Sequence, residues 1–418
     1  MSRPAVDFYD PRTYTAGVPH DAFAVLRREC PVYRQEERAI LGWPAGPGYW
    51  AVTRYHDVVH VNRNPNLFSS QLGATQIRDP KPEDLAFQRR MMLNLDPPDH
   101  SRLRRIVSKA FTPRRIERLA GFLRDRARAL VDAVAPVGAC DFSQDLAADL
   151  PLLALAEVLG VPAADRRLLF EWGNRVIGFQ DPEYARRDES GRPIDPRSRA
   201  ALADMFDYAH RLAERRRRDP GDDVITGLLL AEVDGQTLSR EEYENFFFLL
   251  TVAGNETLRN VLPSGMLALL EHPGEHRRLL EDPSLLGTAI EEMLRFSGPV
   301  MCFRRTAAAD IELAGVDIAA GDKVVVYYAS ANRDGAVFPD PDRFDIGRTP
   351  NEHLAFGAGP HFCLGAHLAR LQMRVFFEEV LWRLPDLELA GPVQRLQSNF
   401  QAGVKHMPVR FSTKGGIA

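Results

Sequence analysis

One long segment, Ser239 to Leu270, constrains the fold more than any other part of the sequence. Its middle, Phe246-Phe247-Phe248-Leu249-Leu250, has no polar face, so a helix there must be buried on all sides. At about 1.5 Å per residue such a helix spans about 45 Å, enough to cross a whole domain. Ser239 and Glu242 match a capping box at its start. The segment therefore predicts a large helical protein built around one central helix.

Helical spacing of apolar residues also dominates the rest of the chain. It predicts further helices at His100 to Phe111, Arg114 to Val134, Asp145 to Leu159 and Ala366 to Leu384. Strand patterns are short, at Tyr49 to Thr53, Ile311 to Leu313, Lys323 to Tyr328 and Val409 to Phe411. Since no repeat or linker divides the chain, we expect a single domain over residues 1–418, mainly α with a minor β-sheet region.

Composition narrows the classes of function. Hydrophobic residues make up 45% and charged residues 26%, as in globular proteins, and the net charge of -4 gives no general attraction to nucleic acid or anionic lipid. No apolar run approaches the roughly 18 residues that span a membrane, and no secretory pattern opens the chain. Four scattered cysteines lack metal-type spacing. These features predict a soluble, reduced, cytoplasmic protein.

The sharpest motif is the glycine-rich stretch from His353 to His367, which contains Cys363. A lone cysteine is usually an ordinary buried thiol, and a dinucleotide loop is excluded because Phe362 stands where its third glycine belongs. Cys363 lies just before a predicted helix, whose N-terminal N–H groups and dipole stabilise a thiolate. The pattern therefore favours a metal-ligating thiolate beside a flat ligand.

The spacing Phe356-Gly357-x-Gly359-x-His361-x-Cys363-x-Gly365 resembles the haem-binding signature of the cytochrome P-450 superfamily. The resemblance implies the cytochrome P-450 fold, with the long central helix over haem b (iron protoporphyrin IX) and Cys363 as the proximal iron ligand. It also implies that Phe356, Gly357, His361 and Gly365 contact this cofactor.

Two further motifs occur in the order that the resemblance implies. Ala253-Gly254-Asn255-Glu256-Thr257 interrupts the central helix and resembles the acid–alcohol pair of the family, so Glu256 and Thr257 are expected to relay protons to dioxygen. Glu292 and Arg295 resemble the ExxR pair, which Arg343 of Pro341-Asp342-Arg343-Phe344 is expected to complete in a structural role.

The two propionates of haem require buried cations. At the positions that the resemblance indicates, the sequence offers His100 and Arg104 from an HxxxR helix, Arg305 from Arg305-Thr306-Ala307, and His353 at the start of the cysteine loop. Any one of them alone is more typical of a solvated surface charge.

The resemblance implies a monooxygenase that takes O2, a hydrophobic substrate and electrons from separate proteins. Because the chain ends at Ala418, we expect a ferredoxin and its NAD(P)H-dependent reductase to supply those electrons. Arg102, Arg105, Arg114 and Arg115 are the hypothetical docking residues for an acidic ferredoxin.

The substrate-contacting segments implied by the resemblance are mostly apolar here, which predicts a substrate with few polar groups. Their candidate lining residues are Met92, Phe179, Val252, Ala253, Val300, Met301 and Phe303. One of these segments includes the polar stretch Asp181 to Arg199, which the sequence predicts to be a mobile loop. The residues around Glu256 and the tail Ser398 to Lys405 look similar to actinobacterial hydroxylases of sterols, methyl-branched lipids and terpenoids.

Four alternatives remain at this stage: a hydroxylase that tailors polyketides or other natural products, a peroxide-driven peroxygenase, a non-enzymatic haem sensor, and a helical binding protein without haem. Glu256 and Thr257 argue against the peroxygenase, and a sensor needs neither a proton relay nor a substrate pocket.

Overall fold

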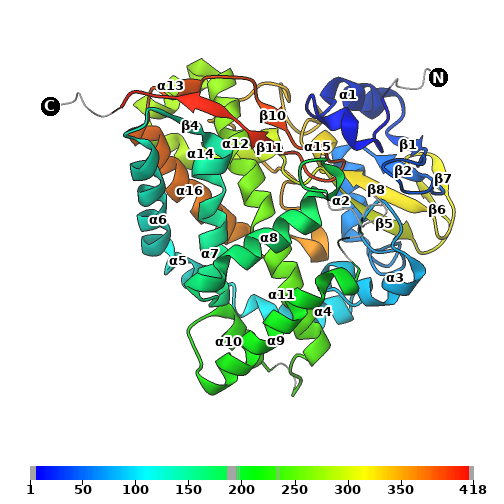
Figure 1. The fold of residues 1–418 in the computed structure, drawn as a ribbon. Coiled ribbons are helices and arrows are strands. Elements are labelled where there is room, and N and C mark those ends of the chain that lie inside the picture. The colour runs from blue at the N-terminus through cyan, green and yellow to red at the C-terminus, as the bar shows by residue number, and fades with distance from the viewer. Residues whose placement is uncertain (1–5, 186–193, 195, 197, 233–234, 414–418) are drawn as a thin grey trace.

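The structure, a computed structural model, describes residues 6–185, 194, 196, 198–232 and 235–413. Most helices gather on one side of the molecule and the strands of the largest sheet on the other (Figure 1). The helices are α1 His20–Glu29, α2 Tyr55–Arg63, α3 Pro82–Gln88, α4 Asp99–Ser108, α5 Pro113–Glu117, α6 Ala120–Val134, α7 Asp149–Leu159, α8 Arg166–Ile177, α9 Ala203–Arg218, α10 Val224–Leu229, α11 Arg240–Ala253, α12 Glu256–Glu271, α13 Pro273–Glu281, α14 Leu286–Ser297, α15 Tyr328–Ala331 and α16 Ala366–Arg383.

The central segment is divided into two helices, α11 and α12, within the stretch Ala253 to Thr257 where the sequence predicts an interruption. The predicted capping box of Ser239 and Glu242 is present at the start of α11. The break falls at Gly254 and Asn255, where a Cβ on Gly254 would lie 2.8 Å from the carbonyl oxygen of Leu250 and 2.9 Å from the side chain of Leu155 in α7. The backbone of α11, with the close packing of α7, therefore favours glycine at the point where the helix is interrupted.

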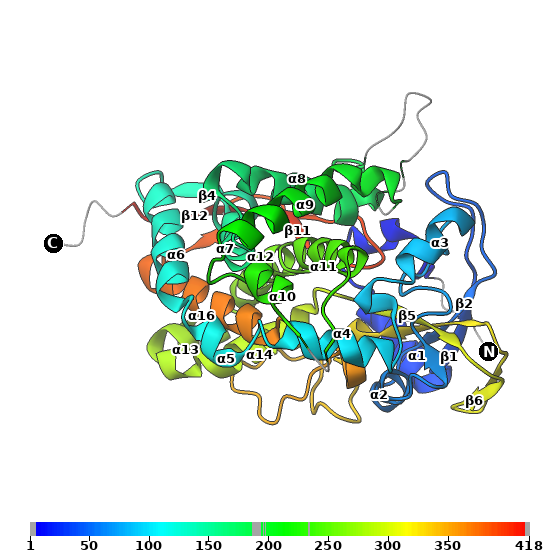
Figure 2. The same ribbon diagram turned by 90° about the horizontal axis from the view of Figure 1, so that it is seen from below.

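Helices α11 and α12 occupy the middle layer of the helical part. Figure 2 shows them between a layer that contains α8 and α9 and a layer that contains α14 and α16. The largest cluster of buried apolar side chains joins these layers, and Phe247 of α11 is completely buried in it. The predicted burial of this segment on all sides is thus confirmed.

Two predictions of helices need correction, and one predicted loop lies partly outside the described residues. The stretch from Arg114 to Val134 is divided into α5 and α6 by a turn in which the N–H of Leu119 donates to the carbonyl oxygen of Ile116. The stretch from Asp145 begins as a π-helical turn, Phe142–Ala147, before α7, which ends as predicted at left-handed Gly160. Of the predicted loop Asp181 to Arg199, residues 186–193, 195 and 197 lie outside the described part.

The largest sheet has the strand order β1-β2-β8-β5-β3, in which only β2 and β8 pair in parallel. Its strands are β1 Val32–Gln35, β2 Tyr49–Val52, β8 Lys323–Tyr327, β5 Cys302–Ala307 and β3 Phe68–Ser69. The smaller sheets contain β4 Ala139–Asp141, β6 Ile311–Leu313, β7 Val316–Ile318, β9 Glu388–Leu389, β10 Gln394–Arg395, β11 Val404–His406 and β12 Pro408–Arg410. The four predicted strands are all present within one residue at each end.

Sequence patterns missed strand β5, although it carries two of the candidate site residues. Its charged pair Arg304-Arg305 hides the strand pattern, yet both side chains are buried. The mainly α class with minor sheets is confirmed. Among the described residues, none of the helices combines the length and the apolar character needed to cross a membrane.

Candidate functional site

The loop that carries Cys363 is a tight hairpin that leads into α16. Gly357 and Gly359 have left-handed φ values of 72° and 71°, and the N–H of Cys363 donates to the carbonyl oxygen of Phe356 at 2.9 Å. A Cβ on Gly359 would lie 2.3 Å from the carbonyl oxygen of Asn62 in α2. Glycine is therefore required at Gly359 both by its conformation and by the close approach of α2.

The surroundings of the Cys363 sulfur counter the cost of its burial. Burial raises the pKa of the thiol, whereas the N–H of Gly365 and the charges of Arg104 and Arg370 act in the opposite direction. The guanidinium carbon of Arg370 lies 4.5 Å from the ring centre of Phe356, which forms a buried apolar wall beside the loop. Such a thiol suits a metal, because coordination deprotonates it outright.

Four basic side chains, from α4, β5 and the cysteine loop, converge near Cys363. The rings of His100 and His361 are 4.1 Å apart, and burial together with the charge of Arg104 lowers the pKa of His100 to about 4. Burial also lowers the pKa of His361, with Arg305, His100 and Arg104 contributing. The Nδ1 atom of His100 is buried without a hydrogen-bond partner. This one buried nitrogen atom is therefore open to a hydrogen-bond partner from a bound group.

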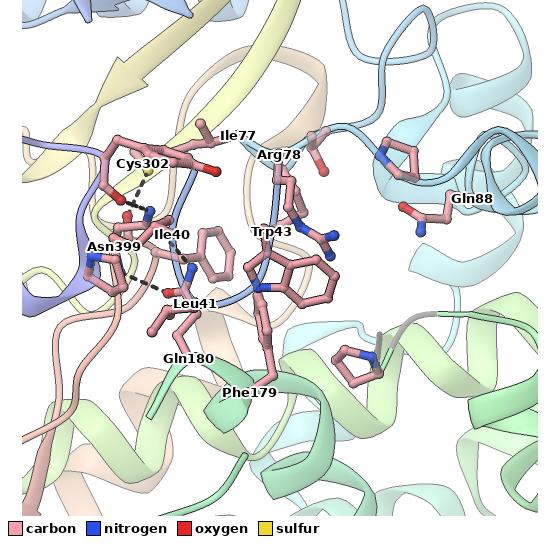
Figure 3. Close-up of a pocket in the computed structure, with 17 residues that line it drawn as sticks. Ile40, Leu41, Trp43, Ile77, Arg78, Gln88, Phe179, Gln180, Cys302 and Asn399 are labelled. Atoms are coloured by element: carbon pink, nitrogen blue, oxygen red, sulfur yellow. Dashed lines mark hydrogen bonds between the residues drawn. The ribbon is translucent and has the colours of Figure 1, made fainter. Parts of the chain in front are cut away.

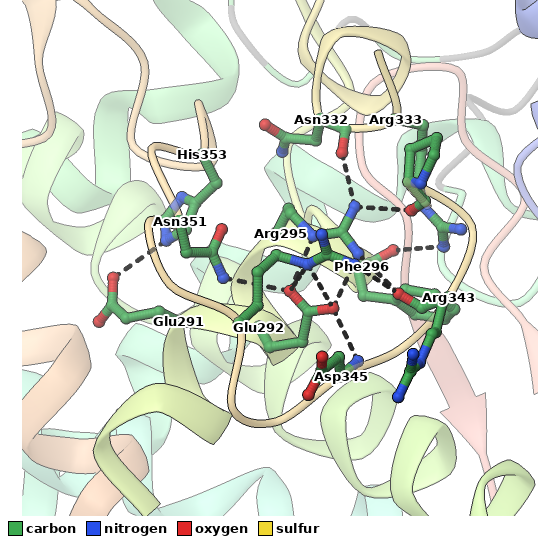
Figure 4. Close-up of polar contacts among 12 residues, drawn as sticks. Glu291, Glu292, Arg295, Phe296, Asn332, Arg333, Arg343, Asp345, Asn351 and His353 are labelled. Atoms are coloured by element: carbon green, nitrogen blue, oxygen red, sulfur yellow. Dashed lines mark hydrogen bonds and ion pairs between the residues drawn. The ribbon is translucent and has the colours of Figure 1, made fainter. Parts of the chain in front are cut away.

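His353 does not belong to this cluster, contrary to the expectation from sequence. Its Nε2 atom lies 3.0 Å from the carboxylate of Glu291 in α14, and its Nδ1 accepts the N–H of Ala355 (Figure 4). Arg370 binds the same carboxylate at 2.6 and 2.7 Å. Burial raises the pKa of Glu291, but bonds from Arg370 and His353 outweigh it and hold the pKa at about 2. His353 thus fixes the start of the loop against α14.

The predicted pair of Glu292 and Arg295 is present and completely buried. Two parallel hydrogen bonds of 2.7 and 2.8 Å join the guanidinium to the carboxylate. Arg295 also donates to the carbonyl oxygens of Asn332, Pro341 and Arg343, which lie on the chain leading to the cysteine loop (Figure 4).

The residue that completes this pair is Arg348, not Arg343. Arg348 Nε lies 3.2 Å from both carboxylate oxygens of Glu292, and its side chain is 9% exposed. Arg343 is exposed and contributes only its carbonyl oxygen, which accepts from Arg295 and Arg348. The turn between Arg343 and Arg348 directs the Arg348 side chain toward Glu292. A motif that is defined by local spacing does not reveal this.

The break between α11 and α12 exposes small groups inside an otherwise buried segment. Ala253 is exposed and Gly254 and Thr257 are half-buried, while Val252 and Leu258 beside them are buried. The Thr257 hydroxyl donates to the carbonyl oxygen of Ala253 at 2.9 Å. The segment is therefore partly accessible at the position where the sequence predicts the proton relay.

Glu256 is directed away from Thr257, toward Arg259 and α8. Its carboxylate is 3.7 Å from Arg259 Nη1 and accepts from the amide of Asn255 at 3.4 Å. A Cβ on Gly173 of α8 would come within 2.9 Å of the same carboxylate. Burial raises the pKa of Glu256, and Arg259 only partly opposes it. The two expected relay residues are neighbours in sequence, but their side chains have different partners.

The expected substrate residues fall into three groups. Phe179 lines a pocket, and Phe400 lines the same pocket and meets the ring of Phe303 edge to face, with 5.3 Å between the ring centres. Met92, Val252 and Val300 are buried or half-buried near these segments, and Ala253 is exposed at the helix break. Met301 is completely buried in a small cluster with Tyr14 and Ala329, and its contact with substrate stays a prediction.

The pocket also contains Trp43, which the sequence did not indicate, and Arg78, which lies in the segment Leu72 to Met92 that the resemblance implies to contact substrate (Figure 3). Both lie in connections between regular elements, where no periodic pattern marks them. A tryptophan in the Gly- and Pro-rich stretch 41–48 was the available signal.

Taken together, these groups fit a flat, iron-containing group with two carboxylates. The thiol is the expected metal ligand, Arg104 and Arg305 offer positive charge for the carboxylates, and His100 and His361 offer further hydrogen-bond partners. The fold and this arrangement define the class of haem-thiolate proteins.

The comparison with known proteins agrees. The family model described as "Cytochrome P450" matches residues 191–385. A steroid C26-monooxygenase from Rhodococcus jostii is 40% identical, covering 98% of this chain and 85% of the relative. A methyl-branched lipid omega-hydroxylase from Mycobacterium tuberculosis is 44% identical, covering 94% of this chain and 90% of the relative. The chain belongs to the cytochrome P450 family.

Solved structures support the same assignment. A Mycobacterium marinum cytochrome P450 in complex with pseudoionone matches with a TM-score of 0.85 and 40% identity, over 95% of this chain and 96% of that one. The cytochrome P450 of the bacillaene polyketide synthase of Bacillus subtilis matches with a TM-score of 0.85 and 35% identity, over 99% and 100%. The protein is therefore a haem-dependent monooxygenase that uses O2 and redox partners to hydroxylate hydrophobic substrates.

The buried charge cluster yields a prediction that separates two arginines. Arg348→Leu removes a cation from the fully buried Glu292 and is expected to destabilise the fold by about 3 kcal/mol. Arg343→Leu is expected to change stability by less than about 0.5 kcal/mol, because its side chain is exposed. Denaturant titration of both variants makes the comparison, and equal losses would contradict the assignment of Arg348.

The cluster of His100, Arg104, Arg305 and His361 predicts which histidine retains haem. His361→Ala removes a charge-assisted partner and is expected to speed haem loss about tenfold. His353→Ala is expected to lower thermal stability, because Glu291 loses a bond, while haem loss changes little. Transfer of haem to apomyoglobin measures both rates. Faster haem loss from His353→Ala than from His361→Ala would contradict the assignment of His361 to the cofactor and of His353 to Glu291.

Proposed function

We propose that this cytochrome P450 hydroxylates the end of an extended hydrophobic chain, on a methyl-branched lipid, a sterol side chain or a terpenoid. The supporting observation is the pair of relatives at 40% and 44% identity, whose names specify C26 of a steroid and the omega position of a methyl-branched lipid. Both names describe oxidation at the end of an apolar chain. The structure bound to pseudoionone adds a terpenoid ligand to this set.

In this proposal the cofactor is haem b, bound by the residues described above. Cys363 holds the iron, Phe356, Gly357 and Gly365 contact the ring from the thiolate side, and His100, Arg104, Arg305 and His361 hold the two propionates. Buried guanidinium and imidazole groups suit carboxylates because charge-assisted hydrogen bonds are strong in a low-dielectric site. Haem, when bound, supplies the activation of dioxygen.

Thr257 and Glu256 then deliver the protons. The Thr257 hydroxyl holds a proton at Oγ1 at the helix break, and burial raises the pKa of Glu256, which favours its protonated form. The Glu256 carboxylate lies 3.7 Å from Arg259. For Glu256 to take part in the relay, its side chain has to rotate from this position near α8 toward the break.

Electrons come, in this proposal, from a ferredoxin and an NAD(P)H-dependent reductase. The face nearest Cys363 is the proposed docking site, but its charges are less available than the sequence suggests. Arg102 is paired with Glu242, Arg115 lies 3.5 Å from Asp222, and Arg114 is exposed. Arg114 is accordingly the docking residue we favour. The four cysteines are all unpaired, which is consistent with a reducing cytoplasm.

A second candidate, tailoring of a polyketide, is supported by the similarity to the bacillaene synthase enzyme. Glu256 and Thr257 continue to argue against a peroxide-driven reaction, since such a reaction has no need of a proton relay.

The test is the position of the new hydroxyl group. The purified holoenzyme is supplied with ferredoxin, reductase and NADPH and given a methyl-branched fatty acid, a sterol with a side chain, a terpenoid or a macrolide. We expect mass spectrometry to find hydroxylation at a chain end in one of the first three. Hydroxylation of the macrolide alone would favour the tailoring function instead.

The same assay includes Thr257→Ala as a matched variant. Loss of the hydroxyl is expected to leave NADPH consumption in place while hydroxylated product falls about tenfold or more and peroxide accumulates. Tight coupling of NADPH to product in this variant would remove Thr257 from the relay.

A further inference from the structure

One buried amide, that of Asn62 near the end of α2, lies beside the proposed cofactor site. Its side chain is 3% exposed, so its oxygen and its NH2 group need partners inside the protein. The Nδ2 atom donates to the carbonyl oxygen of Val58, one helical turn earlier, at 3.1 Å. This bond sets the orientation of the amide, and Oδ1 is therefore the atom that is left for the neighbouring elements.

The amide oxygen of Asn62 accepts two hydrogen bonds from different parts of the fold. Arg305 of β5 donates through Nη2 at 3.1 Å, and the hydroxyl of Tyr328, the first residue of α15, donates at 3.3 Å. Both donors are 3% exposed. One neutral oxygen thus joins α2 to the strand and to the helix that follows β8, at a residue proposed to hold a propionate of haem.

Arg305 depends on such bonds because its charge is buried. Burial lowers the pKa of Arg305, while the nearby Tyr328 and Asp96 act in the opposite direction. Its Nη1 donates to the carbonyl oxygen of Arg304 at 2.8 Å. A guanidinium carries more N–H donors than these two, and all of them lie in one rigid plane. The bonds to Asn62 and to Arg304 therefore fix the plane in which the other donors of Arg305 meet a ligand.

The same residues also pack against the cysteine loop. A Cβ on Gly359 would lie 2.3 Å from the carbonyl oxygen of Asn62, and a Cβ on Gly357 would lie 3.6 Å from Tyr328 Oη. Both glycines belong to the hairpin that presents Cys363. Asn62 thus supports the loop with its backbone and Arg305 with its side chain, which couples the two parts of the proposed site.

The partners of Arg305 hold it without cancelling its charge. The oxygen atoms that it bonds in the described part of the chain belong to an amide and to a peptide group, which are both neutral. Asp96, whose charge acts on Arg305, accepts hydrogen bonds from the Ser69 hydroxyl and, at 2.8 Å, from the Ser70 N–H. A carboxylate in the place of the amide oxygen would form an ion pair with Arg305 instead.

We propose that Asn62 is a positioning residue for haem: it holds Arg305 through a neutral oxygen, so that the full positive charge of Arg305 acts on a propionate. A positive charge close to haem favours the reduced iron, and hydrogen bonds around a cofactor tune its potential. Asn62 therefore raises the reduction potential and slows the loss of haem. This inference rests on the proposed binding of haem by Arg305 and deepens it.

The test is Asn62→Asp in the holoenzyme, a change that keeps the shape of the side chain and places a carboxylate beside Arg305. We expect the reduction potential of the haem to fall, because the paired Arg305 stabilises the reduced iron less. Transfer of haem to apomyoglobin is expected to be about tenfold faster, as the loss of one charge-assisted hydrogen bond allows. A spectroelectrochemical titration measures the potential.

Asn64→Asp is the matched control, because it makes the same change two residues along the chain, where the amide bonds to the carbonyl oxygen of His60 and not to Arg305. It should keep the potential and the transfer rate of the wild type. Equal values for Asn62→Asp and Asn64→Asp would overturn the role of Asn62.

Asn62→Ser separates charge from packing, because it removes the amide and adds no charge. It is expected to keep the potential of the wild type and to speed haem transfer about threefold, since Arg305 loses a fixed partner but keeps its charge. A fall in potential as large as that of Asn62→Asp would overturn the proposal. If Asn62→Asp retains too little haem for a titration, the transfer rate of Asn62→Ser decides, and a wild-type rate would overturn the proposal.

Arg305→Gln distinguishes this proposal from the one on which it rests. If Arg305→Gln changes the potential and the transfer rate but Asn62→Asp changes neither, the positioning role fails and the binding of haem by Arg305 stands. If neither variant has an effect, both fail. An effect of Asn62→Asp without one of Arg305→Gln would also overturn the positioning role. The position of the new hydroxyl group is measured separately, so a failure of chain-end hydroxylation leaves the role of Asn62 intact.

Discussion

Two adjacent glutamates of α14 fix the loop on which the chemistry depends. Glu292, completely buried, binds Arg295 and Arg348 and so holds the chain that approaches the loop. Glu291 binds His353 at the start of the loop and Arg370 in the helix after it. Buried ion pairs add little net stability but are costly to break. Their effect here is to define one position for Cys363 relative to α14.

Strand β5 links the parts of the site that the helices do not supply. Phe303 and Arg305 lie on one face of the strand, while Arg304 on the other face pairs with Asp79 next to the pocket. One short strand thus takes part both in the proposed cofactor site, through Arg305, and in the wall of the pocket, through Cys302.

The sequence predicted features that depend on local spacing and missed those that depend on the path of loops. The hairpin glycines, the capping box of Ser239 and the pairing of Glu292 with Arg295 follow from spacing within a few residues. The choice of Arg348 over Arg343 depends on a turn, and the placement of His353 depends on Glu291, a residue distant in sequence. Trp43 and Arg78 meet only through folding, so no motif could join them.

The central claim is that the Cys363 sulfur binds the haem iron within this held loop. The carbon monoxide difference spectrum of the reduced protein tests it directly, because the position of the band reports thiolate ligation. We predict the thiolate-type band for the wild type and its loss in Cys363→Ser with haem still bound. An unchanged band in that variant, or a wild-type protein without the band, would contradict the account.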